Sequence, residues 1–212
     1  MQDQLALSTL QQILEIIGTF AFAISGIRLA AAKHFDWFGG YVCGIAVAIG
    51  GGTIRDLMLG AVPFWMTSPL YIICTGFALL FVIIFTKYMK KLDITWLVFD
   101  TLGLALFTIA GIQKSLAYGQ PFWVSIIMGC ITGAAGGVIR DVLLNSVPLI
   151  FQKEIYAMAC VAGGLVYWLL SWLGISNNFT VLISFLVVCV IRILAVKYHI
   201  SLPVLRGEEE IN

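Results

Sequence analysis

The sequence has few charged side chains for its length. Asp, Glu, Lys and Arg make up 11% of the 212 residues, whereas 61% are hydrophobic, and the mean hydropathy is +1.02. A soluble domain carries about 25% charged residues, so this chain lacks the polar surface that water requires. We therefore expect a protein whose solvent is the lipid bilayer.

Several functional signatures are also missing. The 12 basic and 11 acidic residues leave a net charge of +1, and no basic block is dense enough for a row of phosphates, so we expect no nucleic-acid partner. The five cysteines form no C-x-x-C pair, and no hydrolase, zinc-protease or nucleotide-binding motif occurs. We predict no enzyme activity, no cofactor and no resident metal.

Long apolar stretches, by contrast, fill the chain. A helix needs about 20 mostly apolar residues to cross a bilayer, and the stretches lack the alternation that marks membrane β-strands. Short loops with Gly, Pro, Asn or charged residues separate them. We predict an all-α polytopic membrane protein with seven transmembrane helices: Gln12–Ala32, Phe38–Leu59, Pro69–Tyr88, Ile94–Ile112, Phe122–Leu144, Ile155–Leu173 and Phe179–Val196.

Basic residues gather on one side of these predicted spans. Lys114 is alone on the other side, and Arg55 and Arg140 fall within spans. Basic loops face the cytoplasm, so we predict a multi-pass protein of the inner cell membrane, with the N-terminus outside and the C-terminus cytoplasmic. The basic side holds Arg28, Lys33, Lys87, Lys90, Lys91, Lys153, Arg192, Lys197 and Arg206.

An internal repeat organises the chain. A shift of 85 residues aligns many identical positions, which include Gly18 with Gly103, Phe22 with Phe107, Arg55 with Arg140, Asp56 with Asp141, Pro63 with Pro148 and Tyr71 with Tyr156. Three helices per copy is an odd number, so the second copy enters the membrane from the opposite side. We predict one transmembrane domain with repeat one at about 12–91, repeat two at about 94–175, a seventh helix at about 179–197 and a short cytoplasmic tail at 198–212.

Glycines lie midway along the second and fifth predicted helices. Inverted repeats usually place an ion or substrate path at their interface, beside interrupted helices. We predict that the glycines interrupt these helices and turn backbone carbonyls toward K⁺ or Na⁺, although small residues also let helices pack closely. The predicted path is lined by Gly50, Gly51, Gly52, Thr53, Gly133, Gly136, Gly137 and Ser25.

Six ionisable residues within or beside the spans recur in both copies. An ionisable residue at the centre of a span costs at least about 2.5–3.5 kcal/mol, so such residues usually face a cavity and find a partner. We predict that Glu15 approaches Arg55 and that Asp100 approaches Arg140, which forms two charged vestibules around a narrow middle. Alternatively, the pairs only pin helices together. The six residues are Glu15, Arg55, Asp56, Asp100, Arg140 and Asp141.

The duplicated Gly-Gly-x-Ile-Arg-Asp sequences at 51–56 and 136–141 resemble those of the trimeric intracellular cation (TRIC) channels, especially the prokaryotic branch. Similar bacterial sequences are also grouped as a glycine-transporter domain family. The resemblance covers roughly Leu14 to Val196. It implies a homotrimer with one pore in each protomer, glycine-kinked second and fifth helices beside that pore, and K⁺ and Na⁺ as permeant ions.

Two functional classes remain open. A channel needs a continuous wet path with weak ion contacts at several sites. A secondary transporter of glycine or another small amino acid needs a closed midplane site for a zwitterion. The charged residues lie nearer the span ends than the glycines, and this favours the channel. A purely structural scaffold is the least favoured interpretation, because the charges inside the spans are paired.

Overall fold

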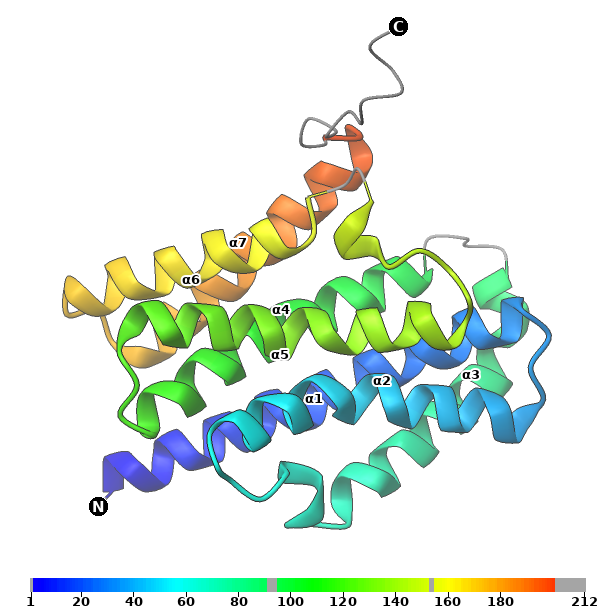
Figure 1. Cartoon of the computed structure of the whole chain (residues 1–212), viewed down its shortest axis with the longest axis horizontal. Helices are drawn as coiled ribbons and strands as arrows, with labels where there is room; N and C mark the ends of the chain where they lie inside the picture. The colour runs from blue at the N-terminus through cyan, green and yellow to red at the C-terminus, as the bar shows by residue number, and fades with distance from the viewer. Residues whose placement is uncertain (1, 91–94, 153–154, 201–212) are drawn as a thin grey trace, which may run out of the picture.

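The computed structural model describes residues 2–90, 95–152 and 155–200, and the side chains of 9–86, 95–152 and 155–200. These residues form helices and loops without a strand, which confirms the all-α prediction (Figure 1). The predicted tail at 198–212 lies mostly outside this range. The helices are α1 (Gln2–Ala32), α2 (Trp37–Met58), α3 (Leu70–Lys90), α4 (Thr95–Ala117), α5 (Phe122–Leu143), α6 (Ala157–Trp172) and α7 (Asn177–Lys197), with 3₁₀ turns η1 (Phe64–Met66) and η2 (Leu149–Phe151).

The repeat is visible in the bounds of the helices. Helices α2 and α5 begin and end at positions 85 residues apart, as do η1 and η2. Local chemistry sets these bounds: Asp36 caps α2, since its Oδ1 accepts a hydrogen bond of 2.7 Å from the Gly39 amide, and Gly60 follows the helix with a φ of 68°. Asn145, the equivalent of Gly60, follows α5 with a φ of 50°.

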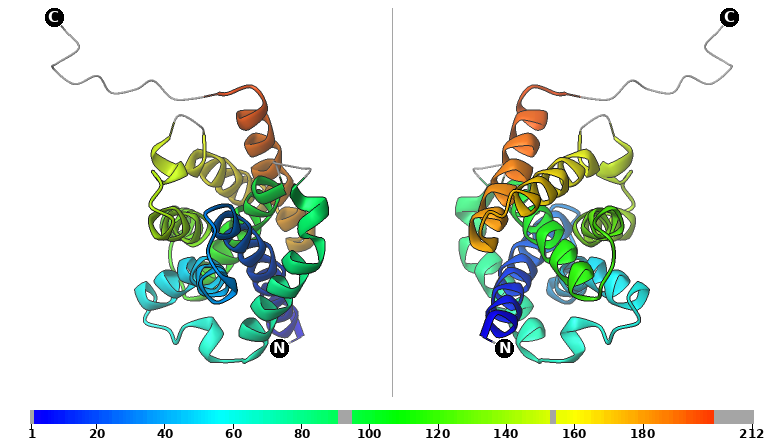
Figure 2. Two further views of the ribbon diagram at one scale, coloured as in Figure 1. Left: turned by 90° about the vertical axis from the view of Figure 1, so that its right-hand side faces the viewer. Right: turned by 90° about the vertical axis from the view of Figure 1, so that its left-hand side faces the viewer.

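Equivalent helices of the two repeats pack against each other. Helix α1 packs on α4 and α2 packs on α5, and in Figure 1 α1 and α4 run in opposite directions. The end views place α6 and α7 toward one side of the bundle and α2 with η1 toward the other (Figure 2). The fold is therefore two inverted three-helix repeats related by a pseudo-two-fold axis, with α7 packed on α6 and α4.

The distribution of polarity is inverted relative to a soluble protein. Large apolar side chains such as Trp37, Phe38 and Ile84 are at least two-thirds exposed, whereas the three largest fully buried side chains are arginines: Arg55, Arg140 and Arg192. Within the described residues, five helices are long and apolar enough to cross a membrane, and the apolar stretches of α3 and α6 are shorter. This arrangement is that of a polytopic membrane protein.

Two phenylalanines occupy the centre of the bundle. The rings of Phe22 and Phe107, equivalent positions of the two repeats, stack with centroids 5.5 Å apart and planes inclined by 11°. The Phe107 ring packs against Gly18 and the Phe22 ring against Gly103, where a Cβ would clash. The two glycines thus admit the stacked pair between α1 and α4.

The glycines of α2 and α5 do not interrupt their helices, so that prediction is wrong: both helices are continuous through them. A Cβ on Gly51 would collide with the Thr132 carbonyl oxygen, and one on Gly136 would lie 2.5 Å from the Val47 carbonyl oxygen. Each missing side chain therefore lets one helix lie directly on the backbone of the other. Close packing of this kind needs no broken hydrogen bond.

The remaining glycines of the two stretches also face neighbours. A Cβ on Gly50 would meet Ile139 of α5, and one on Gly52 would meet the Phe64 ring. In α5, a Cβ on Gly137 would lie 2.6 Å from Tyr156 Oη, and one on Gly133 would lie 2.8 Å from the Leu104 carbonyl oxygen of α4. These residues form the central helix contacts of the fold.

Candidate functional site

The first polar site, the repeat-one cluster, consists of Glu15, Arg55, Asp56, Tyr71 and Lys114. Arg55 Nη2 donates to Glu15 Oε1 at 2.8 Å, and its Nε donates to Asp56 Oδ1 at 2.7 Å. Tyr71 Oη donates to the second Glu15 oxygen at 3.2 Å. The arginine therefore joins α2 to α1, and the tyrosine adds α3.

Asp56 has two further partners. Lys114 Nζ of α4 lies 2.8 Å from its Oδ1, and the Phe64 amide of η1 donates to its Oδ2 at 2.7 Å. Asp56 is fully buried, whereas the Lys114 side chain is 14% exposed. With two cations and two carboxylates, the ionised repeat-one cluster carries no net charge.

The second polar site, the repeat-two cluster, consists of Ser25, Asp100, Arg140, Asp141 and Tyr156. Arg140 Nη1 pairs with Asp100 Oδ1, and Nε donates to Asp141 Oδ1 at 2.8 Å. Arg140 Nη1 also donates to Ser25 Oγ of α1 at 3.0 Å. The Leu149 amide of η2 donates to Asp141 Oδ2 at 2.9 Å, as the equivalent amide of η1 does in repeat one.

Arg192 of α7 packs against Tyr156 of the repeat-two cluster. The Arg192 guanidinium carbon lies 4.7 Å from the centroid of the Tyr156 ring, in cation–π geometry. Its Nη1 donates to the Ile155 carbonyl oxygen at 2.9 Å. Arg192 is fully buried, so it belongs to the interior of the bundle, next to Tyr156.

The two clusters lie at opposite ends of the bundle. Helix α1 supplies Glu15 to one and Ser25 to the other, and α4 supplies Lys114 and Asp100. At 1.5 Å per helical residue, these positions are about 15–20 Å apart along the axes. The stacked phenylalanines lie on the same two helices between them, so an apolar layer separates two charged ends.

The predicted pairings of Glu15 with Arg55 and of Asp100 with Arg140 are confirmed. All six predicted charged residues are at most 5% exposed, and their role as vestibules stays a prediction. The sequence analysis did not predict that three further residues belong to the clusters: Tyr71, Lys114 and Tyr156. The tyrosines are among the residues that coincide at the 85-residue shift, and Lys114 is the one basic residue on its side, so signals for all three existed.

The predicted hydroxyl ligands are engaged within the protein. Ser25 accepts from Arg140, as described above. Thr53 Oγ1 donates to the Ile49 carbonyl oxygen at 2.7 Å and accepts from Trp65 Nε1 at 3.1 Å. Thr53 thus ties α2 to η1 in this conformation.

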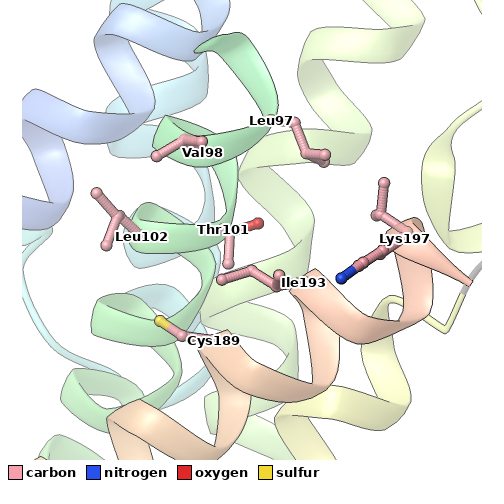
Figure 3. Close-up of a pocket in the computed structure, with 8 residues that line it drawn as sticks. Leu97, Val98, Thr101, Leu102, Cys189, Ile193 and Lys197 are labelled. Carbon is pink, nitrogen blue, oxygen red and sulfur yellow. The ribbon is translucent and has the colours of Figure 1, made fainter. Parts of the chain in front are cut away.

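An apolar pocket of about 440 Å³ lies apart from both clusters, between α4 and α7 (Figure 3). Its polar groups are the Thr101 hydroxyl and the Lys197 ammonium, and no carboxylate lines it. It therefore offers little to a cation. The lining residues are Leu97, Val98, Thr101, Leu102, Cys189, Ile193, Val196 and Lys197.

The described residues contain no cluster of side chains that could coordinate a metal ion. Among the described residues, no three His, Cys, Asp or Glu side chains are placed to hold a metal ion together. The carboxylates of the two clusters are instead engaged by arginine, lysine and backbone amides. Their geometry is that of ion pairs.

Comparison with known proteins identifies the family. The sequence model of a family described as "Glycine transporter" matches the chain twice, over residues 12–87 and 97–172. The chain belongs to this glycine-transporter family. The two matches are offset by 85 residues, so each covers one three-helix repeat.

Similar proteins are membrane proteins by name. The chain is 39% identical to a "UPF0126 membrane protein" of Vibrio cholerae, over 92% of this chain and 83% of the relative. It is 36% identical to the "UPF0126 inner membrane protein YadS" of Escherichia coli K12, over 92% of this chain and 96% of the relative.

The fold of this protein is similar to that of a solved structure. The TRIC trimeric intracellular cation channel orthologue from Rhodobacter sphaeroides superposes with a TM-score of 0.85 at 29% identity, over 91% of this chain and all of that one. The resemblance to prokaryotic TRIC channels that the duplicated motifs suggested therefore extends to the whole fold.

Proposed function

We propose that this protein is a monovalent cation channel with a path inside each seven-helix protomer. The observation that carries the proposal is the pair of buried clusters at opposite ends of one bundle, each with two carboxylates. A structural scaffold has no need for four carboxylates inside spans, where each is costly. The solved relative from Rhodobacter sphaeroides, described as a cation channel orthologue, supports the same function.

The proposed path runs from one cluster to the other beside α2 and α5. In this conformation the Phe22 and Phe107 rings and the direct contact of Gly51 and Gly136 with the facing backbone close the middle. Separation of α2 from α5 would remove the backbone contacts at Gly51 and Gly136 and open the middle of the path to K⁺ and Na⁺. The structure thus corresponds to a closed state of the proposed channel.

Assembly and orientation complete the proposal. The solved relative is described as trimeric, and we propose a homotrimer in the inner cell membrane, embedded in lipid. The excess of Lys and Arg in the odd-numbered loops and the C-terminal end supports an outside N-terminus and a cytoplasmic C-terminus. The repeat-one cluster would then face the outside and the repeat-two cluster the cytoplasm.

Planar-bilayer recording of the purified protein in asymmetric KCl tests the channel. We expect unitary currents that reverse near the K⁺ equilibrium potential and do not change when glycine is added. Silence of the bilayer, together with saturable glycine uptake into proteoliposomes, would contradict the proposal.

Neutral variants test whether the clusters belong to the path. Arg55→Gln and Arg140→Gln are compared with Lys33→Gln, which removes an exposed loop charge. We expect altered conductance or selectivity in the two cluster variants and wild-type currents in the control. Unchanged currents in cluster variants that remain folded would make the ion pairs purely structural.

A glycine transporter is the second candidate, and it has support in the family description. The repeat-two cluster also places a guanidinium beside a carboxylate in a buried position. These groups complement the carboxylate and the ammonium of a zwitterion. The uptake assay described above distinguishes this candidate from the channel.

A further inference from the structure

The tyrosine and the acid of the first helix are hydrogen-bonded to each other in the repeat-one cluster but not in the repeat-two cluster. Tyr71 Oη donates to Glu15 Oε2 at 3.2 Å. At the equivalent positions, Tyr156 Oη and Asp100 Oδ2 are buried, and neither has a hydrogen-bond partner among the described residues. The aspartate side chain is one methylene shorter than the glutamate, so its carboxylate stops short of the tyrosine.

Arg140 Nη2 is also buried without a hydrogen-bond partner among the described residues, as Arg55 Nη1 is in the repeat-one cluster. Arg140 Nη2 and Tyr156 Oη lie beside Gly137, at 3.6 and 2.6 Å from the position that a Cβ would take on that residue. Asp100 is held there as well, because its Oδ1 pairs with Arg140 Nη1. Two unsatisfied atoms thus lie beside the backbone of Gly137, and the third belongs to a carboxylate that is paired with the same arginine.

The chemistry of these atoms selects their ligand. The guanidinium nitrogen only donates, the carboxylate oxygen only accepts, and the phenol does both. Arg140 and Asp100 already neutralise each other, so a ligand without net charge that both donates and accepts complements the three atoms. Buried water typically makes about three hydrogen bonds to polar groups that lack other partners.

We propose that the repeat-two cluster holds one buried water molecule. The water accepts from Arg140 Nη2, donates to Asp100 Oδ2 and completes its bonding with Tyr156 Oη. Tyr156, immediately before α6, is thereby joined to α4 and α5 through a replaceable molecule, whereas Tyr71 joins α3 to α1 directly. The site does not require ion conduction, and a zwitterion held by the same atoms would take the place of the water.

A crystal structure at a resolution that shows ordered water, from crystals grown with Tl⁺, tests the site. We expect one peak without anomalous signal within hydrogen-bond distance of all three atoms. In Asp100→Glu we expect loss of this peak, because the longer acid accepts directly from Tyr156. In the matched variant Glu15→Asp we expect a new water peak beside Tyr71.

Three results would overturn the proposal. An anomalous peak would identify a cation, elongated density after growth with glycine would identify a zwitterion, and a direct bond from Tyr156 to Asp100 in the wild-type protein would leave no place for water. If the variants do not fold, radiolytic hydroxyl labelling of the wild-type protein in detergent decides. Bound water is a source of the radical, so Tyr156 should be labelled and Tyr71 protected; equal protection of both would contradict the site.

Discussion

The two buried clusters have the same arginine–carboxylate pairs but differ at the aspartate that follows the arginine, Asp56 in one and Asp141 in the other. In both, one arginine binds the acid of the first helix of its repeat and the aspartate that follows it. Asp56 also forms an ion pair with Lys114 of α4. The position in α1 that is equivalent to Lys114 is Leu29. Among the described residues, Asp141 therefore has no lysine partner. An inverted repeat can thus keep its ion pairs and still make two chemically different ends.

Removal of the arginines should show this difference most strongly. Loss of one partner of a buried ion pair costs about 3–5 kcal/mol, because the other charge stays buried. We expect Arg140→Met to destabilise the protein by this amount and Arg55→Met by less, since Lys114 still neutralises one carboxylate of the repeat-one cluster. Thermal unfolding in detergent, followed by size exclusion, measures both. Equal losses would show that Lys114 does not compensate.

Substitutions at the α2–α5 contact should affect both repeats alike. We expect Gly51→Ala and Gly136→Ala each to cost about 1–3 kcal/mol or more, because the added methyl group meets backbone and not a movable side chain. Gly40→Ala in α2 is the matched control: its Cβ would meet only Ile27 at 4.0 Å. The same unfolding assay applies. A control as destabilised as Gly51→Ala would point to helix propensity instead of packing.

The tyrosines provide a smaller contrast between the clusters. We expect Tyr71→Phe to cost about 1.5–3 kcal/mol, because it removes a hydrogen bond to a buried carboxylate. Tyr156→Phe should cost less, since the Tyr156 hydroxyl has no protein partner among the described residues. Chemical unfolding of the two variants in parallel measures the difference. A larger loss for Tyr156→Phe would reverse the assignment of the two hydroxyls.

The smallest change in stability is expected for Lys114→Met. The lysine is partly exposed and Asp56 keeps its bonds to Arg55 and the Phe64 amide, so the loss should be about 1 kcal/mol or less. In bilayers, removal of the ammonium leaves the repeat-one cluster with one more carboxylate than cations, and we expect larger cation currents. Lys33→Met, in an exposed loop, should leave currents unchanged. A decrease in the Lys114 variant would mean that the lysine supports conduction.

Much of the fold follows from the sequence because three independent signals agree. Hydropathy predicts the helices, the 85-residue shift predicts the repeat, and the odd number of helices per copy predicts inversion. The pairing of Glu15 with Arg55 was also predictable, because the two residues lie at a similar depth in adjacent spans.

The remaining features depend on what lies opposite each residue. A glycine pair in mid-helix suits a broken helix and a close contact equally well, and only the position of Thr132 against Gly51 decides between them. Lys114 stands at a span end, where hydropathy counts it as a loop charge, yet it reaches a carboxylate of another helix. Tyr156 lacks the bond that Tyr71 makes because Asp100 is one methylene shorter than Glu15. A sequence pattern does not show whether such a side chain reaches its neighbour.

The stacked phenylalanines have a consequence for the history of the chain. A residue that contacts its own counterpart across a two-fold axis makes an isologous contact, the kind found in symmetric homodimers, yet here both partners belong to one polypeptide. In a true homodimer every substitution occurs twice. In a fused pair, one half can acquire Lys114 while the other keeps Leu29, so the fusion of the halves permits the two ends of the molecule to diverge.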